Sequence, residues 1–275
     1  MRYSAKSIVI TGASDGIGAE IARQLAVQGP RLVLAARSAD KLESVAASCR
    51  SLGADVEVVA ADVSLDDDCR RIAQTAIDRF GGIDVLVANA GVSMHARFDE
   101  ITDFATFERL WRVNCLGTVQ AVRHCWDALK ASRGQIVGIS SLAGKTGVPA
   151  RSTYCASKFA QSGFLDALRI EAEDFGITVS VVYPGVVATD IRRNGLDGRG
   201  ERAGTSGLDE AGAMPVAECA RQIIDAMTAR RREWVMTPRA RFGLWLKLIA
   251  PRLVDNMARA ALARSSPAPS NRTSR

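Results

Sequence analysis

Three residues in the middle of the chain combine side chains that can move a proton at a carbonyl oxygen. Tyr154 and Lys158 are four residues apart, which places them on one face of a helix, one turn apart. A nearby cation favours a phenolate, so Lys158 is expected to lower the pKa of Tyr154 toward the range of a general acid/base. Ser141 follows the apolar run 135–140, which predicts a buried strand whose carboxyl end presents the Ser141 hydroxyl.

A glycine-rich segment near the N-terminus, Thr11-Gly12-Ala13-Ser14-Asp15-Gly16-Ile17-Gly18, has the features of a pyrophosphate-binding turn. It follows a strand-like run at 7–10 and leads into a helical pattern at 19–25. Glycines allow a close backbone approach to phosphate, and a helix N-terminus favours anions. The alternative is a glycine-rich turn that binds nothing. Its occurrence together with Ser141, Tyr154 and Lys158 favours a dinucleotide site.

The order of the elements predicts an α/β fold: a doubly wound parallel sheet of Rossmann type, in one domain with helices on both faces. We expect strands near 7–10, 32–36, 56–60, 84–88, 135–140, 178–183 and 234–236. We expect helices near 17–28, 39–52, 66–80, 104–131, 152–175 and 215–230. Phe104 to Ala131 reads as one long helix.

On these motifs the chain resembles the single-domain short-chain dehydrogenases/reductases, from about Lys6 to Pro238. The resemblance includes Asp62-Val63 after the third strand, Asn89-Ala90-Gly91 after the fourth, Asn114 in the next helix, and 184–189 after the sixth. Within the family, the segments 141–145 and 154–159, Pro149 and the Trp/Leu-rich C-terminal segment look like the branch of 11β-hydroxysteroid dehydrogenases and their member-7-type relatives.

The resemblance implies catalytic roles for four residues. Tyr154 would exchange a proton with the substrate oxygen, and Ser141 would hydrogen-bond to that oxygen. Lys158 would hold the nicotinamide ribose and depress the Tyr154 pKa. Asn114 would connect Lys158 to solvent through a water relay.

The same resemblance implies coenzyme contacts at the strand ends. The residues that it assigns to pyrophosphate and ribose are Gly12, Ser14, Gly16, Ile17 and Gly18. The others are Asp62 and Val63 at the adenine, Asn89 and Gly91 on the adenosine side, Thr189 at the carboxamide, and Pro184, Gly185 and Val187 on the same turn.

The residue after the second strand indicates which coenzyme is used. An NAD site usually has an acidic side chain there to hold the adenosine 2′-hydroxyl, but this chain has Ala36 and then Arg37. A guanidinium can bind a 2′-phosphate through two hydrogen bonds, and the Ser14 hydroxyl could add another. Asp15 argues the other way, because many NADP-dependent relatives have Lys or Arg at that position. On balance we expect NADP (NADPH) in preference to NAD.

These features predict a reversible hydride transfer between the coenzyme and a hydrophobic ketone or aldehyde and its alcohol, such as a steroid- or lipid-like compound. Apolar residues near the expected mouth support this substrate class: Val92, Met94, Leu142, Val148, Val186 and Met214. The alternative is a catalytically silent dinucleotide-binding scaffold or sensor. Epimerisation or dehydration on the same fold is a third class, although such relatives usually carry larger C-terminal domains.

Composition excludes several other classes. The six cysteines are scattered without a Cys-x-x-Cys pair, which argues for a reducing compartment and against disulfides or a metal site. Two histidines leave little for a Ser-His-Asp triad. The net charge of +6 comes from arginines late in the chain, without a nucleic-acid motif, so a solvated basic face is expected. Lacking a signal peptide or an apolar span, the protein is expected in the cytoplasm.

Domain limits follow from shifts in composition. We expect a catalytic domain at 1–238 containing a substrate lid at 190–214, for which a plain exposed loop is the alternative. An amphipathic segment at 239–264 would pack on a partner subunit or over the substrate mouth, with contact at the cytoplasmic face of a membrane as the alternative. The tail 265–275 is disordered by composition. The helices at 104–131 and 152–175 would form a homodimer or homotetramer surface, as the resemblance suggests.

Overall fold

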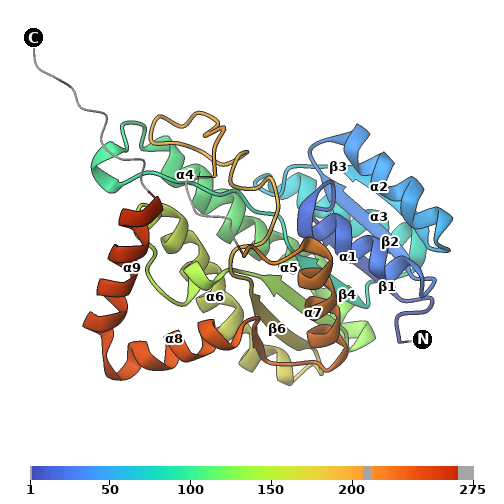
Figure 1. Ribbon diagram of the computed structural model, residues 1–275. Coiled ribbons are helices and arrows are strands. Elements are labelled where there is room, and N and C mark those ends of the chain that lie inside the picture. The colour runs from blue at the N-terminus through green and yellow to red at the C-terminus, as the bar shows by residue number, and fades with distance from the viewer. Residues whose placement is uncertain (1, 207–211, 266–275) are drawn as a thin grey trace, which may run out of the picture.

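A seven-stranded parallel sheet forms the centre of the molecule, in the order β3-β2-β1-β4-β5-β6-β7 (Figure 1). The structure is a computed structural model, and it describes residues 2–206 and 212–265. Nearly unbroken apolar runs form the central strands, as expected for strands that are covered on both faces. The strands are β1 (Ser7–Thr11), β2 (Arg31–Ala36), β3 (Asp55–Ala60), β4 (Val85–Ala88), β5 (Gln135–Ile139), β6 (Thr178–Tyr183) and β7 (Glu233–Val235).

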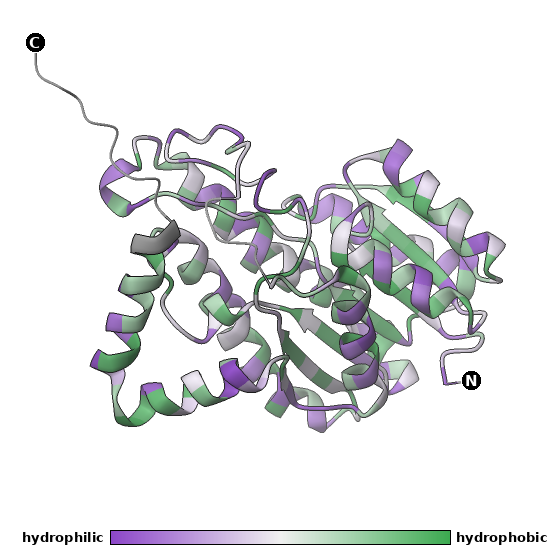
Figure 2. Cartoon of the chain, viewed as in Figure 1, coloured by the Kyte–Doolittle hydropathy of each residue, from purple (hydrophilic) through white to green (hydrophobic). Residues whose placement is uncertain are grey.

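Helices cover both faces of the sheet, and each face has its own apolar core. Ile8 and Ile10 of β1 join one core with helices α1, α2 and α7, whereas Val9 between them joins the opposite core with α3, α5 and α6. This alternation follows from the two-residue period of a strand. Figure 2 shows apolar strands enclosed by helices with polar outer faces. The helices are α1 (Gly16–Ala26), α2 (Ala39–Ser51), α3 (Asp66–Phe80), α5 (Gly117–Ser132), α6 (Ser152–Glu173) and α7 (Val216–Thr228).

The predicted fold class is confirmed, and all seven expected strands are present within a residue or two of their expected bounds. One helix differs from the prediction. The expected helix at 104–131 is divided into α4 (Ala105–Trp111), a π-helical turn η2 (Arg112–Leu116) and α5. Asn114 lies inside that turn, and its side chain bonds to neighbouring segments. Single π-helical turns in α-helices are frequent at functional sites.

The C-terminal segment consists of two helices that extend from β7 as an L-shaped arm (Figure 1). Thr237 caps α8 (Pro238–Ile249), and α9 (Pro251–Ser265) begins after a break at Ala250. Phe242, Trp245 and Leu248 are 60%, 55% and 81% exposed. In the part of the chain that the structure describes, no helix combines the length and hydropathy needed to cross a membrane. Residues 266–275 of the expected tail, and 207–211 of the expected lid, lie outside the described residues.

The carboxyl ends of the strands meet at one edge of the sheet. β1 pairs with β2 on one side and β4 on the other, so the chain order reverses there. In open α/β sheets, ligands bind in the crevice at such a switch point. The loops after β1 to β6 carry the glycine-rich segment, Arg37, Asp62, Asn89, Ser141 and Pro184 to this edge.

Candidate active site

The glycine-rich loop is held against the end of β4 by the side chain of Asn89. Its Nδ2 donates to the carbonyl oxygens of Thr11 (3.0 Å) and Gly12 (3.1 Å). Gly12 has a φ of +66°, and a Cβ there would lie 2.8 Å from the Cα of Ala90. A Cβ on Gly18 would overlap the Gly12 carbonyl and Asn89 Nδ2. Glycine is therefore required at both positions by this close approach, which leaves a cradle of bare backbone at the helix N-terminus.

Thr11 adds a second connection that the sequence analysis did not identify. Its Oγ1 accepts from the backbone N–H groups of Asn89 and Ala90, both at 3.1 Å. The loops after β1 and β4 thus form one rigid unit at the switch point. A polar residue as the last residue of an apolar strand was the available signal.

Asp15 serves as the N-cap of α1. Its Oδ1 accepts from the backbone N–H of Gly16 at 2.6 Å, and its Oδ2 lies 3.8 Å from Lys41 Nζ. Capping a helix N-terminus is a common role for aspartate. The carboxylate that argued against NADP therefore has a local structural function. Ser14 and Ile17 flank this cap and are half-buried.

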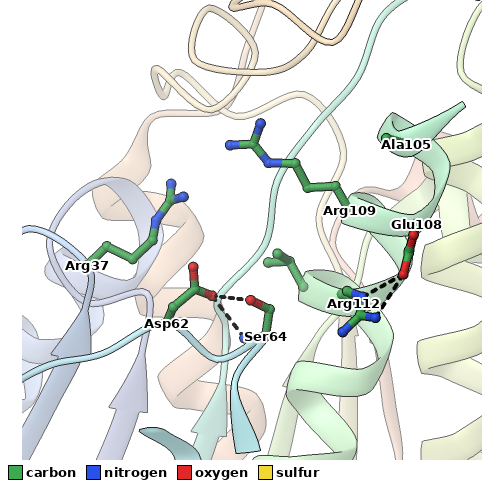
Figure 3. Close-up of a pocket in the computed structure, with 8 residues that line it drawn as sticks. Arg37, Asp62, Ser64, Ala105, Glu108, Arg109 and Arg112 are labelled. Atoms are coloured by element: carbon green, nitrogen blue, oxygen red, sulfur yellow. Dashed lines mark hydrogen bonds and ion pairs between the residues drawn. The ribbon is translucent and has the colours of Figure 1, made fainter. Parts of the chain in front are cut away.

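A cavity of about 270 Å³ opens beside the loop, between the ends of β2 and β3 and helix α4. Arg37 and Asp62 line one side, and Arg109 and Arg112 line the other (Figure 3). The Asp62 carboxylate accepts from the Ser64 N–H (2.9 Å) and hydroxyl (2.7 Å), so it faces its own turn. Val63 is buried beneath it.

The cavity carries more positive than negative charge. Arg112 is neutralised by Glu108, which accepts from its Nε at 2.9 Å. Figure 3 shows the guanidinium groups of Arg37 and Arg109 directed toward the opening from opposite sides. Among the residues that the structure describes, neither Arg37 nor Arg109 forms an ion pair. The sequence analysis missed Arg109, because only the fold brings α4 opposite the end of β2.

Ser141 and Tyr154 come together at the end of β5. Ser141 caps the short 3-10 turn η3 (Leu142–Gly144), where its Oγ accepts from Ala143 N–H at 3.2 Å. Tyr154, on the first turn of α6, is 7% exposed and belongs to an apolar cluster with Met94, Ala143 and Leu196. Val92 and Val148 pack against this cluster, as expected for residues near the mouth. Leu142 and Met214 instead pack against the two sheet cores, and Val186 is exposed.

Burial raises the pKa of Tyr154, and the charge of Arg151 and a hydrogen bond with Ser141 oppose that rise. The sequence analysis gave the opposite direction, with Lys158 as the cause. The reason for the difference is geometric. The Lys158 ammonium is held by other groups of the protein, and desolvation of a buried phenolate outweighs the nearby donors.

Lys158 is buried, with 3% exposure, and its Nζ donates to Ile139 O and Gln161 Oε1, both at 3.0 Å. Gln161 in turn donates to Thr118 Oγ1 at 2.9 Å, which links α6 to α5. Burial lowers the pKa of Lys158 to about 8. No carboxylate is within bonding distance of this ammonium among the described residues, so the ion is stabilised only by neutral oxygens.

Asn114 is completely buried and joins three segments. Its Oδ1 accepts from Val92 N–H (2.8 Å), and its Nδ2 donates to Val92 O (3.0 Å) and Ser157 Oγ (2.9 Å). Ser157 donates to the carbonyl of Tyr154 at 2.8 Å. A Cβ on Gly91 would lie 3.1 Å from Asn114 Oδ1 and 3.5 Å from Lys158 Nζ, so Gly91 is in close contact with both groups.

The turn after β6 completes the edge of the site. Pro184 O accepts from Leu142 N–H at 2.9 Å, which ties this turn to the one that carries Ser141. Val187 is buried against the sheet, and Gly185 and Thr189 are half-buried. A Cβ on Gly16 would lie 3.2 Å from Thr189 Cγ2. The turn therefore lies directly beside the N-terminus of α1.

The described part of the chain holds no cluster of three or more His, Cys, Asp or Glu side chains that could bind a metal ion. Its six cysteines are free and buried. The chemistry of the edge is thus that of a phenol, a hydroxyl, an amide and an ammonium beside a backbone cradle for an anion.

Comparison with known proteins shows clear relatives. The family model for short chain dehydrogenase matches residues 6–199. An 11-beta-hydroxysteroid dehydrogenase-like protein 4A of Arabidopsis thaliana is 35% identical over 92% of this chain and 83% of its own. A dehydrogenase/reductase SDR family protein 7-like of Dictyostelium discoideum is 34% identical over 92% and 80%. An alcohol dehydrogenase of the archaeon Thermococcus sibiricus, solved with 5-hydroxy-NADP, has a TM-score of 0.74 at 28% identity, covering 84% and 95%.

The buried ammonium of Lys158 predicts a measurable dependence of stability on pH. The pKa of this group is about 8 in the folded protein and 10.5 ordinarily. Below pH 8 the folded state therefore contains an unfavourable buried charge, and this penalty declines as pH rises from 8 toward 10.5. Lys158→Met removes the titration. The free energy of unfolding of wild type should rise by about 2 kcal/mol relative to the variant between pH 7 and 9.5. The free energies of unfolding are measured by denaturant titration at each pH. If they changed with pH in parallel for wild type and Lys158→Met, the lowered pKa of Lys158 would be contradicted.

Proposed function

The chain belongs to the short-chain dehydrogenase family and is an oxidoreductase that acts on CH–OH groups, and we propose that it uses NADP(H) to interconvert a hydrophobic ketone or aldehyde and its alcohol. The observation that carries the proposal is the convergence of Ser141, Tyr154 and Lys158 beside the backbone cradle of Gly12 and Gly18. A nicotinamide coenzyme fits this edge, because a Cβ at either glycine would clash with neighbouring protein atoms, so that both positions present bare backbone beside the N-terminus of α1.

The nicotinamide ring, when bound, supplies or accepts the hydride at its C4. Tyr154 would donate a proton to the substrate oxygen in reduction and remove it in oxidation. Ser141 would donate a hydrogen bond to the same oxygen, where negative charge develops. Lys158 would hold the ribose with its ammonium, and its charge would favour the tyrosinate once it is turned toward the ribose. Asn114 would fix the backbone around Lys158 and lead protons toward solvent.

The preference for NADP(H) is supported by the charges of the cavity beside the cradle. Arg37 lies after β2, where an NAD site usually has a carboxylate. Arg109 faces it across the opening (Figure 3). Two guanidinium groups without an ion pair among the described residues suit a 2′-phosphate, since charge-assisted hydrogen bonds to phosphate are strong. Asp15 does not oppose this, because it caps α1.

A hydrophobic substrate is supported by the apolar cluster around Tyr154. Met94, Leu196 and Ile101 belong to it, and Leu196 comes from the expected lid. Leu196 N–H donates to Ser93 O (2.9 Å), and His95 N–H donates to Leu196 O (3.0 Å). The described part of the segment 190–214 is thus joined to the strip that precedes α4, over the reacting residues. We propose that this segment is a substrate lid.

A homodimer or homotetramer is proposed for the assembly. Helix α6 presents Ile170, 71% exposed, and Phe159, 43% exposed, and α4 presents Trp111, 42% exposed. Exposed large apolar side chains on neighbouring helices are typical of subunit interfaces.

Tyr154→Phe should reduce kcat/KM by about 10²- to 10⁴-fold while leaving the Kd of NADPH nearly unchanged, because only the transferable proton is lost. Turnover is followed by the absorbance of the reduced coenzyme, and binding by its fluorescence. Tyr3→Phe, which removes another buried phenol hydroxyl far from the site, is the matched control. Activity of Tyr154→Phe close to wild type would contradict the acid/base role of Tyr154, whereas a wild type without turnover would favour the scaffold or sensor interpretation.

Arg37→Asp should reverse the coenzyme preference. Wild type should bind NADPH more tightly than NADH by roughly ten- to hundredfold, and the variant should prefer NADH, more strongly at low salt. Arg109→Gln should weaken the binding of NADPH and leave the binding of NADH unchanged. Arg112→Gln is the control within the same cavity, since its guanidinium is paired with Glu108. The dissociation constants of NADPH and NADH, measured at two salt concentrations, test these expectations. An equal loss of affinity for both coenzymes would contradict the role given to Arg37.

Ile170→Glu should shift the protein toward monomer in light scattering at micromolar concentration, because a carboxylate would be buried without a partner in the interface. The side chain is exposed within one chain, so the far-UV circular dichroism should be unchanged. A monomeric wild type would contradict the proposed assembly, and an oligomeric variant of unchanged mass would place the interface elsewhere.

A further inference from the structure

Arg151 is a buried cation beside the proposed proton donor, and nothing described so far uses it. It is 7% exposed and immediately precedes α6, with its guanidinium carbon 5.5 Å from the centre of the Tyr154 ring. Its Nε and Nη2 are buried without a hydrogen-bond partner among the described residues. Buried polar groups are normally hydrogen-bonded, and a buried charge without a partner is strongly unfavourable.

Another arginine of equal burial shows what a structural role looks like in this protein. Arg169 is also 7% exposed. Its Nη1 lies 2.7 Å from Asp166 Oδ1, and its Nε donates to Val179 O at 2.9 Å. Arg169 thus has a carboxylate and a backbone oxygen as partners, whereas Arg151 has neither within the described part of the chain.

The surroundings of Arg151 make its charge still less favourable. It lies at the N-terminus of a long helix, where the macrodipole opposes a cation. Burial and the charge of Arg192 both lower the pKa of Arg151, and the groups that oppose them are Tyr154 and Cys155, not a carboxylate. The protein therefore holds a positive centre that its own described residues do not neutralise.

The imidazole of His95, next to Arg151, is a second buried polar group without a hydrogen-bond partner among the described residues. The N–H of Ala96 donates to Ala150 O at 3.0 Å, which brings His95 alongside Arg151. His95 Nε2 is also buried without a partner among the described residues. Burial, and then the Arg151 charge, lower the pKa of His95 and favour its neutral form. A neutral imidazole beside a guanidinium can complete the coordination of an oxyanion.

The coenzyme does not account for this positive centre. Its phosphates have the cradle after β1 and the arginine cavity beyond β2. Arg151 instead lies at the start of α6 beside Tyr154 and does not line the arginine cavity, and Arg192 is part of the expected lid. An anion bound at Arg151 would therefore be part of the substrate, whose oxygen contacts Tyr154.

We propose that Arg151 binds an anionic group of the substrate, so that the substrate is an amphiphilic carbonyl compound or alcohol carrying a carboxylate or phosphate. This inference rests on the proposed function and narrows its substrate class. The apolar cluster of Met94, Ile101 and Leu196 receives the hydrocarbon part, and the guanidinium fork orients the anion so that the carbonyl faces Ser141 and Tyr154.

Equilibrium binding tests the site without requiring turnover. The probes are octanoate, octyl phosphate and octan-1-ol, titrated into the complex of the full chain with NADP. Wild type should bind at least one of the two anions roughly ten- to hundredfold more tightly than the alcohol. Arg151→Met, similar in length but uncharged, should abolish this preference, and Arg151→Lys should retain part of it. The comparison of octanoate with octyl phosphate distinguishes the two kinds of anion.

Turnover and stability give independent readouts. Oxo-octanoates with the carbonyl at different positions should be reduced faster than their methyl esters by wild type, and Arg151→Met should lose this discrimination. Arg151→Met should also unfold at the same or a higher temperature than wild type, because it removes an unpaired buried charge. Arg169→Met is the matched control. It should unfold at a lower temperature than wild type, because it removes the partner of the Asp166 carboxylate.

The outcomes separate the two proposals. Anion binding that depends on Arg151, without reduction of any probe, would leave this site in place and contradict the proposed reaction. Equal binding of anions and alcohol by wild type would overturn the anion site. So would an Arg151→Met variant that loses stability and weakens all probes equally, since that pattern indicates a structural arginine.

Discussion

The burial of the Lys158 ammonium is the constraint on which the rest of the site depends. A charge at 3% exposure is tolerated only where oxygen atoms replace water, and here those atoms are Ile139 O and Gln161 Oε1. Ile139 ends the strand that leads to Ser141, and Gln161 connects through Thr118 to α5. The position of the ammonium thereby fixes β5, α5 and α6 relative to one another. Any displacement of one of these elements would expose or isolate the charge.

The π-helical turn belongs to a second buried set of hydrogen bonds next to Lys158. Asn114 has to bond to Val92 on one side and Ser157 on the other, and both bonds are made deep in the protein. An extra residue in the helical turn at 112–116 accommodates these contacts without ending the helix. Ser157 then bonds to the Tyr154 carbonyl, so that the start of α6 is held by the same amide. The site is thus a rigid polar network, and such networks stabilise a structure only when their members are satisfied.

The sequence predicted the sheet and most of its helices because apolar runs and glycine-rich turns are local signals. The prediction failed where a tertiary contact decides the outcome. The helix at 104–131 looks uniform in sequence, and the π-helical turn coincides with the buried contacts of Asn114 with Val92 and Ser157. The predicted direction of the Tyr154 pKa shift was wrong, because helical spacing identifies neighbouring residues but does not reveal burial. Arg109 and the bonds of Thr11 to the end of β4 were missed because the fold, not the sequence order, brings α4 to β2 and β1 to β4.

Charge is the property that sequence reasoning handled least well, and it now distinguishes two ends of the site. The late arginines were assigned to a solvated basic face, yet one of them, Arg192, is only 7% exposed, as are Arg151 and Arg169 earlier in the chain. Arg37 and Arg109 face the cavity beyond β2, while Arg151 lies next to Tyr154. Between them the reacting groups are surrounded by apolar side chains, where electrostatic interactions are weakly screened. Positive centres at these two places would bind the coenzyme phosphate and the proposed substrate anion separately, so that the carbon accepting the hydride is positioned by charge at a distance and by hydrogen bonds nearby.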